Sequence, residues 1–103
     1  MSLPPLPTDA ELAVLRVLWA HGPSTVRQVF EALSQERTLG YTTVLKTMQV
    51  MLDKGLLARD DSERSHVYRA AAPEGATKGQ LVSDLMSKAF SGSARQLMVH
   101  ALR

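Results

Sequence analysis

Apolar residues recur at helical spacing in successive segments of the first half of the chain. The first segment opens with a capping box, in which Thr8 and Glu11 cap each other's backbone, and it ends at Gly22. Its apolar positions are Leu12, Leu15, Leu18 and Trp19. The second segment has Ser24 as its expected N-cap. Its apolar positions are Val26, Val29, Phe30 and Leu33. Both patterns predict amphipathic helices.

A third segment predicts a helix from Tyr41 or Thr42 to Lys54, with Gly55 as the residue that ends it. One side of this helix is apolar and comprises Val44, Met48, Met51 and Leu52. The opposite side is mainly polar and comprises Thr42, Thr43, Lys46, Thr47, Gln49 and Val50. The helix therefore has one face for a core and another for solvent or a partner.

The pattern then changes to two short strands. Residues 56–59 and 66–70 alternate in the manner of a β-hairpin, and residues 60–65 between them are all polar. The connecting segment lacks an Asn-Gly type of tight turn, so we expect a longer, mobile loop.

Helical spacing returns in the last third of the chain. Residues 73–76 look like a linker, after which Thr77 and Ser93 each fit the start of a helix and Gly92 fits a C-cap between them. The apolar positions of the two helices are Leu81, Val82, Leu85, Met86, Ala89 and Phe90, and then Leu97, Met98, Ala101 and Leu102. The predicted order is ααα-ββ-αα.

This order predicts a mainly α fold with a small β-hairpin, in which residues 1–73 form a winged helix-turn-helix domain. In such a domain the third helix can enter the major groove of DNA while the hairpin reaches the neighbouring backbone. The residues expected to contact DNA from the third helix are Tyr41, Thr42, Thr43, Lys46 and Gln49. Short polar residues at a helix start can also be simple caps, and Leu45 fits either the edge of the core or a contact with thymine methyl groups.

The polar loop of the hairpin carries further candidates. Arg64 and His66 are the residues expected to contact DNA phosphates from this wing. Asp60, Asp61 and Glu63 lie among them and would repel DNA, so a solvated hairpin tip is the alternative interpretation.

Residues 74–103 are predicted to be a dimerisation arm. Two helices of about 12 residues are marginal alone, so their apolar faces need a partner, and a second copy of the chain is the simplest one. The alternative is that they fold back on the winged helix of their own chain.

Composition narrows the function classes. The chain has 103 residues and no Cys, which excludes disulfides, thiolate metal sites and cysteine nucleophiles and fits a reducing, cytoplasmic location. No segment has the length and apolar character of a membrane span or a secretory signal. Residues 1–73 hold eight basic and eight acidic groups, and the net charge of +2 lies in residues 74–103. The histidines are widely spaced at His21, His66 and His100, and we expect no metal, no cofactor and no enzyme.

Two stretches resemble the penicillinase repressor (BlaI/MecI/CopY) family. They are residues 8–19, with Trp19 near the end of the first helix, and residues 40–57, which contain the Tyr41-Thr42-Thr43-Val44 segment. The resemblance extends from about residue 6 to residue 103 and includes Tyr68 at the second strand. It implies a bacterial transcriptional repressor that binds dyad-symmetric operator DNA as a homodimer. By position, the family's dimerisation helices would include Leu81, Leu85, Phe90, Leu97 and Met98.

The chain also departs from the family's pattern. The resemblance implies a membrane metalloprotease as an inactivating partner, because repressors of the β-lactam branch are cut at an Asn-Phe bond. The chain has no Asn, and His100-Ala101 stands near that position, so release by the same cut is not supported. The Cys-x-Cys pair of the copper-responsive branch is absent. By comparison with the family, the chain stops early in its last helix, so we expect a short member or a shortened chain.

A winged helix can alternatively serve as a protein-interaction adaptor without sequence-specific DNA binding. Such adaptors need apolar anchors on the outer face of the third helix. Here that face is mainly Thr, Lys and Gln, so a DNA-binding repressor is the favoured interpretation.

Overall fold

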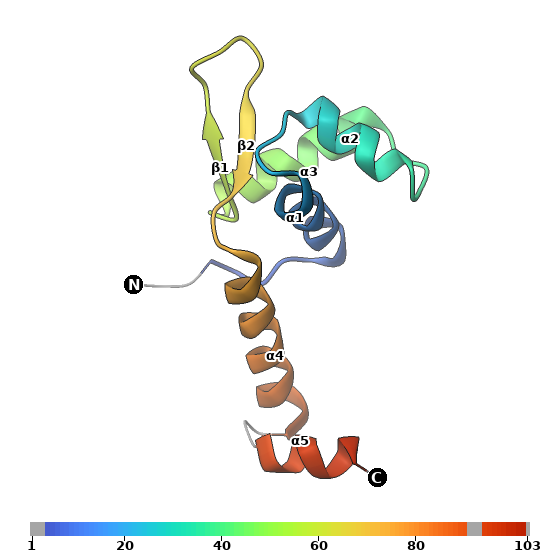
Figure 1. Ribbon diagram of the computed structural model, residues 1–103, viewed down its shortest axis with the longest axis vertical. Helices are drawn as coiled ribbons and strands as arrows, with labels where there is room; N and C mark the ends of the chain where they lie inside the picture. Colours follow the sequence, from blue (N-terminus) through green and yellow to red (C-terminus); the bar gives the residue numbers. More distant parts are fainter. Residues whose placement is uncertain (1–3, 91–93, 103) are drawn as a thin grey trace. The chain divides into compact units, whose positions relative to one another are not determined.

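The computed structural model describes residues 4–90 and 94–102 of the chain. Its elements, labelled in Figure 1, are α1 (Asp9–His21), α2 (Val26–Ser34), α3 (Tyr41–Asp53), β1 (Leu57–Asp60), β2 (Val67–Ala70), α4 (Glu74–Phe90) and α5 (Ala94–Ala101). The chain divides into two compact units, Met1–Pro73 and Glu74–Arg103.

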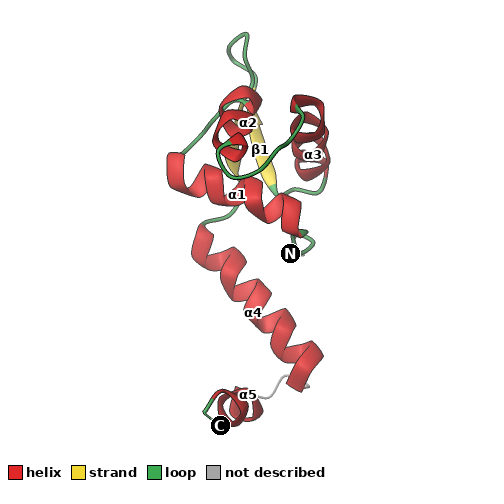
Figure 2. Ribbon diagram, turned by 90° about the vertical axis from the view of Figure 1, so that its right-hand side faces the viewer, coloured by secondary structure: helices red, strands yellow, loops and turns green. Residues whose placement is uncertain are grey.

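The first unit is a three-helix cluster with a two-stranded hairpin. In Figure 2, α1 crosses below α2 and α3, and each of the three helices packs on the other two. Their apolar faces form the core together with Leu56, Leu57 and Tyr68 at the base of the hairpin. The most completely buried side chains are Val14, Leu15, Val29, Met48 and Met51. These elements are the predicted winged helix, and the predicted fold class is confirmed.

Capping boxes begin the first two helices. The Thr8 N–H donates to Glu11 Oε1 at 2.9 Å and the Glu11 N–H donates to Thr8 Oγ1 at 3.2 Å, as predicted. The prediction of Ser24 as the cap of α2 is wrong, because Thr25 caps this helix through a reciprocal pair with Gln28. Only Thr25 has a glutamine three residues on, and that spacing is what a capping box requires.

Ser24 instead joins the hairpin to the helices. Its backbone pairs with Tyr68 through N–H···O bonds of 2.9 and 2.8 Å, and its hydroxyl donates to the Gly22 carbonyl. This single bridge places the residue before the α2 cap against β2. Sequence patterning did not predict the bridge, because one residue of pairing has no periodicity.

The end of α3 determines where the hairpin starts. The Leu56 N–H donates to the Met51 carbonyl and the Gly55 N–H donates to the Leu52 carbonyl, which completes a Schellman motif with Gly55 at φ +82°. Leu56 therefore belongs to the helix cap, and β1 begins one residue later than predicted. The strands pair antiparallel from Leu57 opposite Ala70 to Asp60 opposite Val67. β2 likewise starts at Val67, not at His66.

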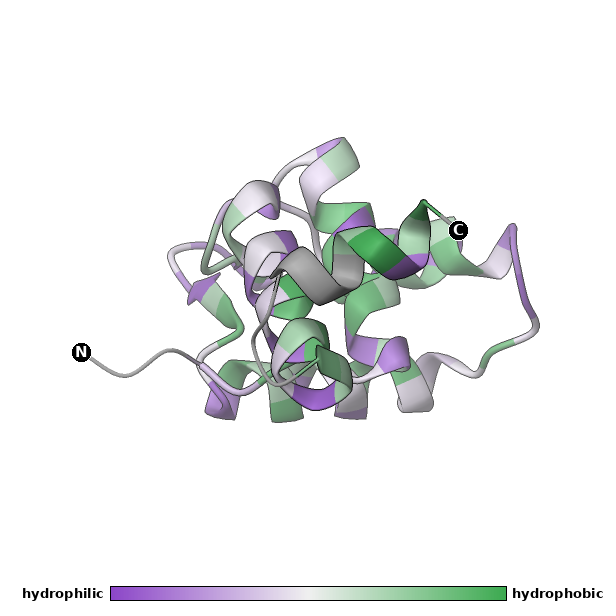
Figure 3. Ribbon diagram, turned by 90° about the horizontal axis from the view of Figure 1, so that it is seen from below, coloured by the Kyte–Doolittle hydropathy of each residue, from purple (hydrophilic) through white to green (hydrophobic). Residues whose placement is uncertain are grey.

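The second unit comprises α4 and α5. The prediction of a linker at residues 73–76 and a helix start at Thr77 is wrong, because α4 already begins at Glu74. Pro73 precedes it, and Glu74 in the first turn pairs with Lys78, both of which favour a helix start here. The predicted caps Gly92 and Ser93 lie outside the described residues. Figure 3 shows apolar and polar residues alternating along the helices.

Residues 4–90 and 94–102 contain neither a candidate membrane span nor a candidate metal cluster. No helix in this part of the chain is both long and apolar enough to cross a membrane. The same residues contain no group of three or more His, Asp or Glu side chains able to hold a metal ion.

Candidate nucleic-acid interface

The outer face of α3 is polar and exposed. Val44, Met48 and Met51 point into the core, with at most 3 % of each residue exposed. The opposite face exposes all five residues predicted to contact DNA from this helix, which are Tyr41, Thr42, Thr43, Lys46 and Gln49. Leu45 packs partly against the core, so the structure places it at the core edge. A rigid helix thus presents hydroxyl, ammonium and amide groups on a surface that base edges can approach.

The first turn of α3 differs from those of α1 and α2. Its N-cap is Gly40, which has no side chain to accept a hydrogen bond, so no side chain caps this turn. Uncapped N–H groups at a helix start, together with the helix dipole, favour an anion such as a phosphate. Thr42 and Thr43 lie in this turn. The Thr43 carbonyl accepts from the Thr47 hydroxyl at 2.9 Å, so Thr47 is held against the helix.

The wing carries an ion-paired aspartate, Asp61, and has Arg64 beside Glu63 at its tip. Asp61 forms an ion pair with Arg59 at 2.7 Å and lies 3.7 Å from His66 Nδ1. The Ser62 N–H donates to Asp60 and lowers the pKa of that carboxyl, so Asp60 stays ionised. Arg64 makes no hydrogen bond or ion pair with the described residues. Of the two predicted wing contacts, Arg64 is therefore unpaired, whereas His66 lies near Asp61.

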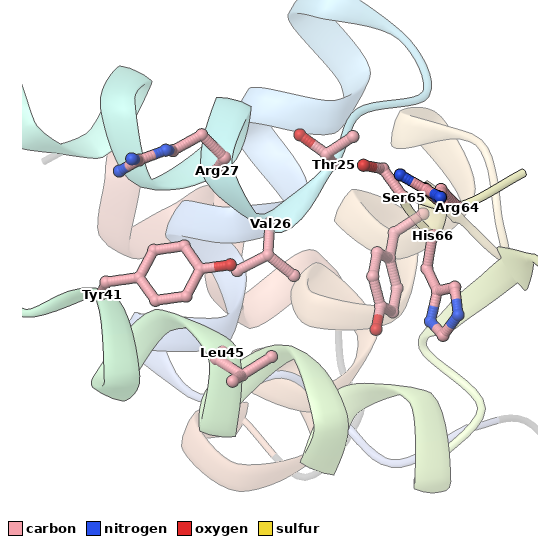
Figure 4. A pocket seen from close by; sticks show the side chains of 9 residues that line it. Thr25, Val26, Arg27, Tyr41, Leu45, Arg64, Ser65 and His66 are labelled. Atoms are coloured by element: carbon pink, nitrogen blue, oxygen red, sulfur yellow. The ribbon is translucent and has the colours of Figure 1, made fainter.

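A pocket of about 250 Å³ lies between α2, α3 and the wing. Figure 4 shows Arg27 above Tyr41 on one side, and Arg64, Ser65 and His66 on the other. The structure thus brings the predicted residues Tyr41, Arg64 and His66 together, while Thr42, Thr43, Lys46 and Gln49 do not line the pocket. Sequence reasoning missed Thr25 and Arg27. The only signal for Arg27 was a basic residue in the first turn of α2, and a single residue forms no periodic pattern.

A buried ion pair fixes the far end of α3. Lys54 Nζ lies 2.8 Å from Glu11 Oε2, and the Glu11 side chain is only 5 % exposed. Burial by itself would raise the pKa of Glu11, but the hydrogen bonds from Lys54 and Thr8 and the Lys54 charge outweigh it and hold that pKa below its ordinary value. The carboxylate therefore links the start of α1 to the end of α3 as a charged group.

The arm residues predicted to form a dimer lie on α4 and α5. Leu85 and Met98 are more than half exposed, as are Val82 and Leu102. Leu81 and Phe90 are partly buried, and the Phe90 ring lies 5.4 Å from the His100 ring. Leu97 belongs to α5, but its side chain lies outside the described residues. The second unit thus carries an apolar surface that its own two helices do not cover.

Solved structures of known proteins resemble the first unit. One is the solution structure of the Bacillus licheniformis BlaI monomeric form in complex with the blaP half-operator, with a TM-score of 0.62 and 29% identity over 73% of this chain and 92% of that chain. Another is the solution structure of the DNA-binding domain of the repressor BlaI, with a TM-score of 0.62 and 30% identity over 72% of this chain and 90% of that chain.

Sequence comparison reaches further along the chain. The transcriptional regulator BlaI of Mycobacterium tuberculosis, in strains CDC 1551 / Oshkosh and ATCC 25618 / H37Rv, is 38% identical over 94 residues, which are 89% of this chain and 68% of the relative. The family model described as "Penicillinase repressor" matches residues 7–103. The chain therefore belongs to the penicillinase repressor family, whose members are transcriptional regulators and not enzymes.

Proposed function

We propose that the chain represses transcription by binding a dyad-symmetric operator as a homodimer, with the outer face of α3 in the major groove. The observation that carries this proposal is the two-sided α3, whose inner residues Val44, Met48 and Met51 are buried while its outer residues are exposed and, apart from Val50, mainly polar. Similarity to a BlaI structure solved in complex with a half-operator supports operator binding here. A DNA target also fits a cytoplasmic location.

The residues assigned to base and backbone contact come from two elements. Lys46 and Gln49, one turn into α3, carry the groups that pair with guanine and adenine, and Thr42 and Thr43 at the helix start suit phosphate or thymine methyl groups. Arg64 at the wing tip contacts a phosphate, and His66 supports it. Phosphate contacts fix the register of the protein and base contacts select the sequence.

The homodimer is assigned to α4 and α5. Val82 and Leu85 lie about one turn apart on α4 and are both more than half exposed, and Met98 adds an exposed side chain on α5. An uncovered apolar surface of this kind favours association, and twofold symmetry would match a dyad-symmetric site. Release by the membrane metalloprotease is not part of the proposal, because the chain has no Asn for an Asn-Phe cut.

Binding to DNA is tested by footprinting on the promoter of the chain's own operon. The protected palindrome is then titrated against a shuffled duplex of the same composition, between about 50 and 200 mM salt. We expect at least roughly 10³-fold tighter binding to the palindrome and a steep loss of affinity with salt. Equal binding to both duplexes in the ~10⁻⁴–10⁻⁶ M range would leave non-specific attraction only and would support the adaptor alternative.

The dimer assignment has its own test. Leu85→Glu places a charge on the exposed apolar surface of α4, and Ser87→Glu adds the same charge to a neighbouring exposed position. Sedimentation should show that Leu85→Glu shifts the chain to monomer at concentrations where Ser87→Glu stays dimeric. A dimer that survives truncation after residue 73 would contradict the assignment to this arm.

A further inference from the structure

We propose that Arg27 is a further ligand of the DNA backbone, that Tyr41 positions it, and that the pocket between α2 and the wing seats one phosphate group of the operator. This inference rests on the proposed DNA binding and adds to it a contact element, α2. It also changes the role of Tyr41 from reading DNA to holding another side chain.

The pocket has cationic side chains at both ends and hydroxyl groups near them. Arg27 is contributed by α2 and Arg64 by the wing, and the hydroxyls are those of Thr25 and Ser65. Among the described residues Arg64 has no ion-pair partner. Arg27 has only a 4.0 Å contact from its Nε to Glu31, in which both side chains are about two-thirds exposed. Such surface pairs are weak, so the guanidinium of Arg27 remains available to an anion.

Tyr41 holds Arg27 at the α2 edge of the pocket, on the side away from the wing. The centre of the Arg27 guanidinium lies 5.8 Å from the centroid of the Tyr41 ring, a distance typical of a cation–π contact. The Tyr41 ring in turn meets the edge of Phe30 at 5.7 Å with an interplanar angle of 75°, and Phe30 packs against the core. The core thus fixes Phe30, Phe30 fixes Tyr41, and Tyr41 restricts Arg27.

The two walls of the pocket are joined below it. The Ser24–Tyr68 backbone bridge, with bonds of 2.9 and 2.8 Å, connects the residue before the α2 cap to β2. The bridge therefore holds the backbone at the start of α2 next to β2, two residues from His66. At about 250 Å³ the pocket is smaller than those that take drug-sized ligands, and a single phosphate group suits its size and charge.

The first test replaces the arginine in the full-length chain. Arg27→Ala should weaken operator binding about tenfold or more, should weaken shuffled duplex equally, and should reduce the slope of log K against log salt by about 0.9 per protomer. Arg16→Ala removes the same charge from an exposed position of α1 that does not line this pocket, and should change neither quantity. The proposal would be overturned if the slope of log K against log salt were the same for Arg27→Ala as for Arg16→Ala.

The second test separates positioning from direct contact. Tyr41→Phe keeps the ring over which Arg27 lies and should bind operator within about twofold of the unchanged chain. Tyr41→Ala removes the ring and should reduce affinity and salt slope as Arg27→Ala does, with the double variant no weaker than Arg27→Ala alone. The positioning role would be overturned if Tyr41→Phe lowered operator affinity by more than about twofold. It would also be overturned if the double variant lost affinity by the product of the two single losses.

The third test identifies the source of the phosphate group. Inorganic phosphate should compete with operator no better than chloride at equal ionic strength, because the seat is filled by the DNA backbone. Competition by phosphate that Arg27→Ala abolishes would assign the pocket to a free anion instead.

If the unchanged chain binds no operator, the proposed function fails. If it binds operator and Arg27→Ala behaves as Arg16→Ala does, only this inference fails.

Discussion

The Glu11–Lys54 ion pair makes a sharp prediction about stability, because its two partners differ in exposure. The Glu11 side chain is 5 % exposed and that of Lys54 is 34 % exposed. Removing the lysine leaves a buried carboxylate without its cation, whereas removing the charge of Glu11 leaves an ammonium group that can turn to water. Lys54→Met should therefore destabilise the fold more than Glu11→Gln does.

The hydrogen bonds of Glu11 determine how much unfolding free energy each substitution should cost. Its carboxylate accepts from the Thr8 N–H at 2.9 Å and from Lys54 Nζ at 2.8 Å. Glu11→Gln keeps an oxygen for Thr8 and loses only the charge-assisted bond, which is worth roughly 1–2 kcal/mol of unfolding free energy. Lys54→Met should cost about 3 kcal/mol, the low end of the range for breaking a buried pair, because Lys54 is partly solvated.

The stabilisation by the Glu11–Lys54 pair should depend on pH and should decrease in acid. The pKa of Glu11 is lower in the folded chain than its ordinary value, so the stabilisation is complete at neutral pH and is lost as the pH falls below about 4.3 and through the folded-state pKa. Glutamine does not titrate. The difference between the unchanged chain and Glu11→Gln should therefore be largest near neutrality and should close in acid.

Urea unfolding followed by the fluorescence of Trp19 measures these differences. Trp19 is the only tryptophan, and its indole N–H donates to the Ala72 carbonyl at 3.1 Å, so unfolding exposes it. All variants are compared at one protein concentration because a dimer's stability depends on concentration. Equal midpoints for Glu11→Gln and the unchanged chain at neutral pH, or a difference that persists unchanged in acid, would refute the reasoning.

Three further predictions concern binding and local conformation. Lys46→Ala should weaken operator binding by roughly 1–3 kcal/mol if Lys46 reads a base, while Lys88→Ala on α4 should not, as measured by fluorescence anisotropy. Glu63→Gln should tighten binding to every duplex slightly, because it removes a negative charge beside Arg64; unchanged affinity would place the wing tip away from DNA. Gly55→Ala should cost about 1–2 kcal/mol in urea unfolding, since φ is +82° there although nothing lies within 4 Å of an added Cβ; a neutral change would show that the Schellman turn relaxes.

Most of the fold could be predicted because its signals are local. The capping box of Thr8 and Glu11, the glycine that ends α3 and the apolar stripe through Val44, Met48 and Met51 each occupy a single turn or a single helix. Residues a few positions apart report such features directly. The errors were also local. The pattern predicts Ser24 as the cap of α2, whereas Thr25 has the glutamine three residues on, and it predicts a start of α4 at Thr77, whereas the helix begins at Glu74 directly after Pro73.

The part of the site that could not be predicted is built from distant residues. Periodicity identified the exposed face of α3 with Lys46, but nothing in the sequence joins Arg27 to Tyr41 or Glu11 to Lys54. These contacts depend on how helices pack, and packing brings together residues far apart in the chain. The same holds for the Ser24–Tyr68 bridge, which decides that α2 and the wing share one pocket.

Net charge says little about this surface, because an approaching phosphate responds to where the unpaired charges lie. Residues 1–73 hold equal numbers of acidic and basic groups, and three of the acids have cations of their own, Glu11 with Lys54, Glu31 with Arg27 and Asp61 with Arg59. Lys46 and Arg64 have no ion-pair partner among the described residues. Neighbouring opposite charges contribute little field beyond about 8–10 Å at physiological salt, so an approaching phosphate responds mainly to unpaired cations near it. A formally neutral domain can therefore present positive charge to DNA at α3 through Lys46, whereas at the wing the negative charge of Glu63 lies beside Arg64.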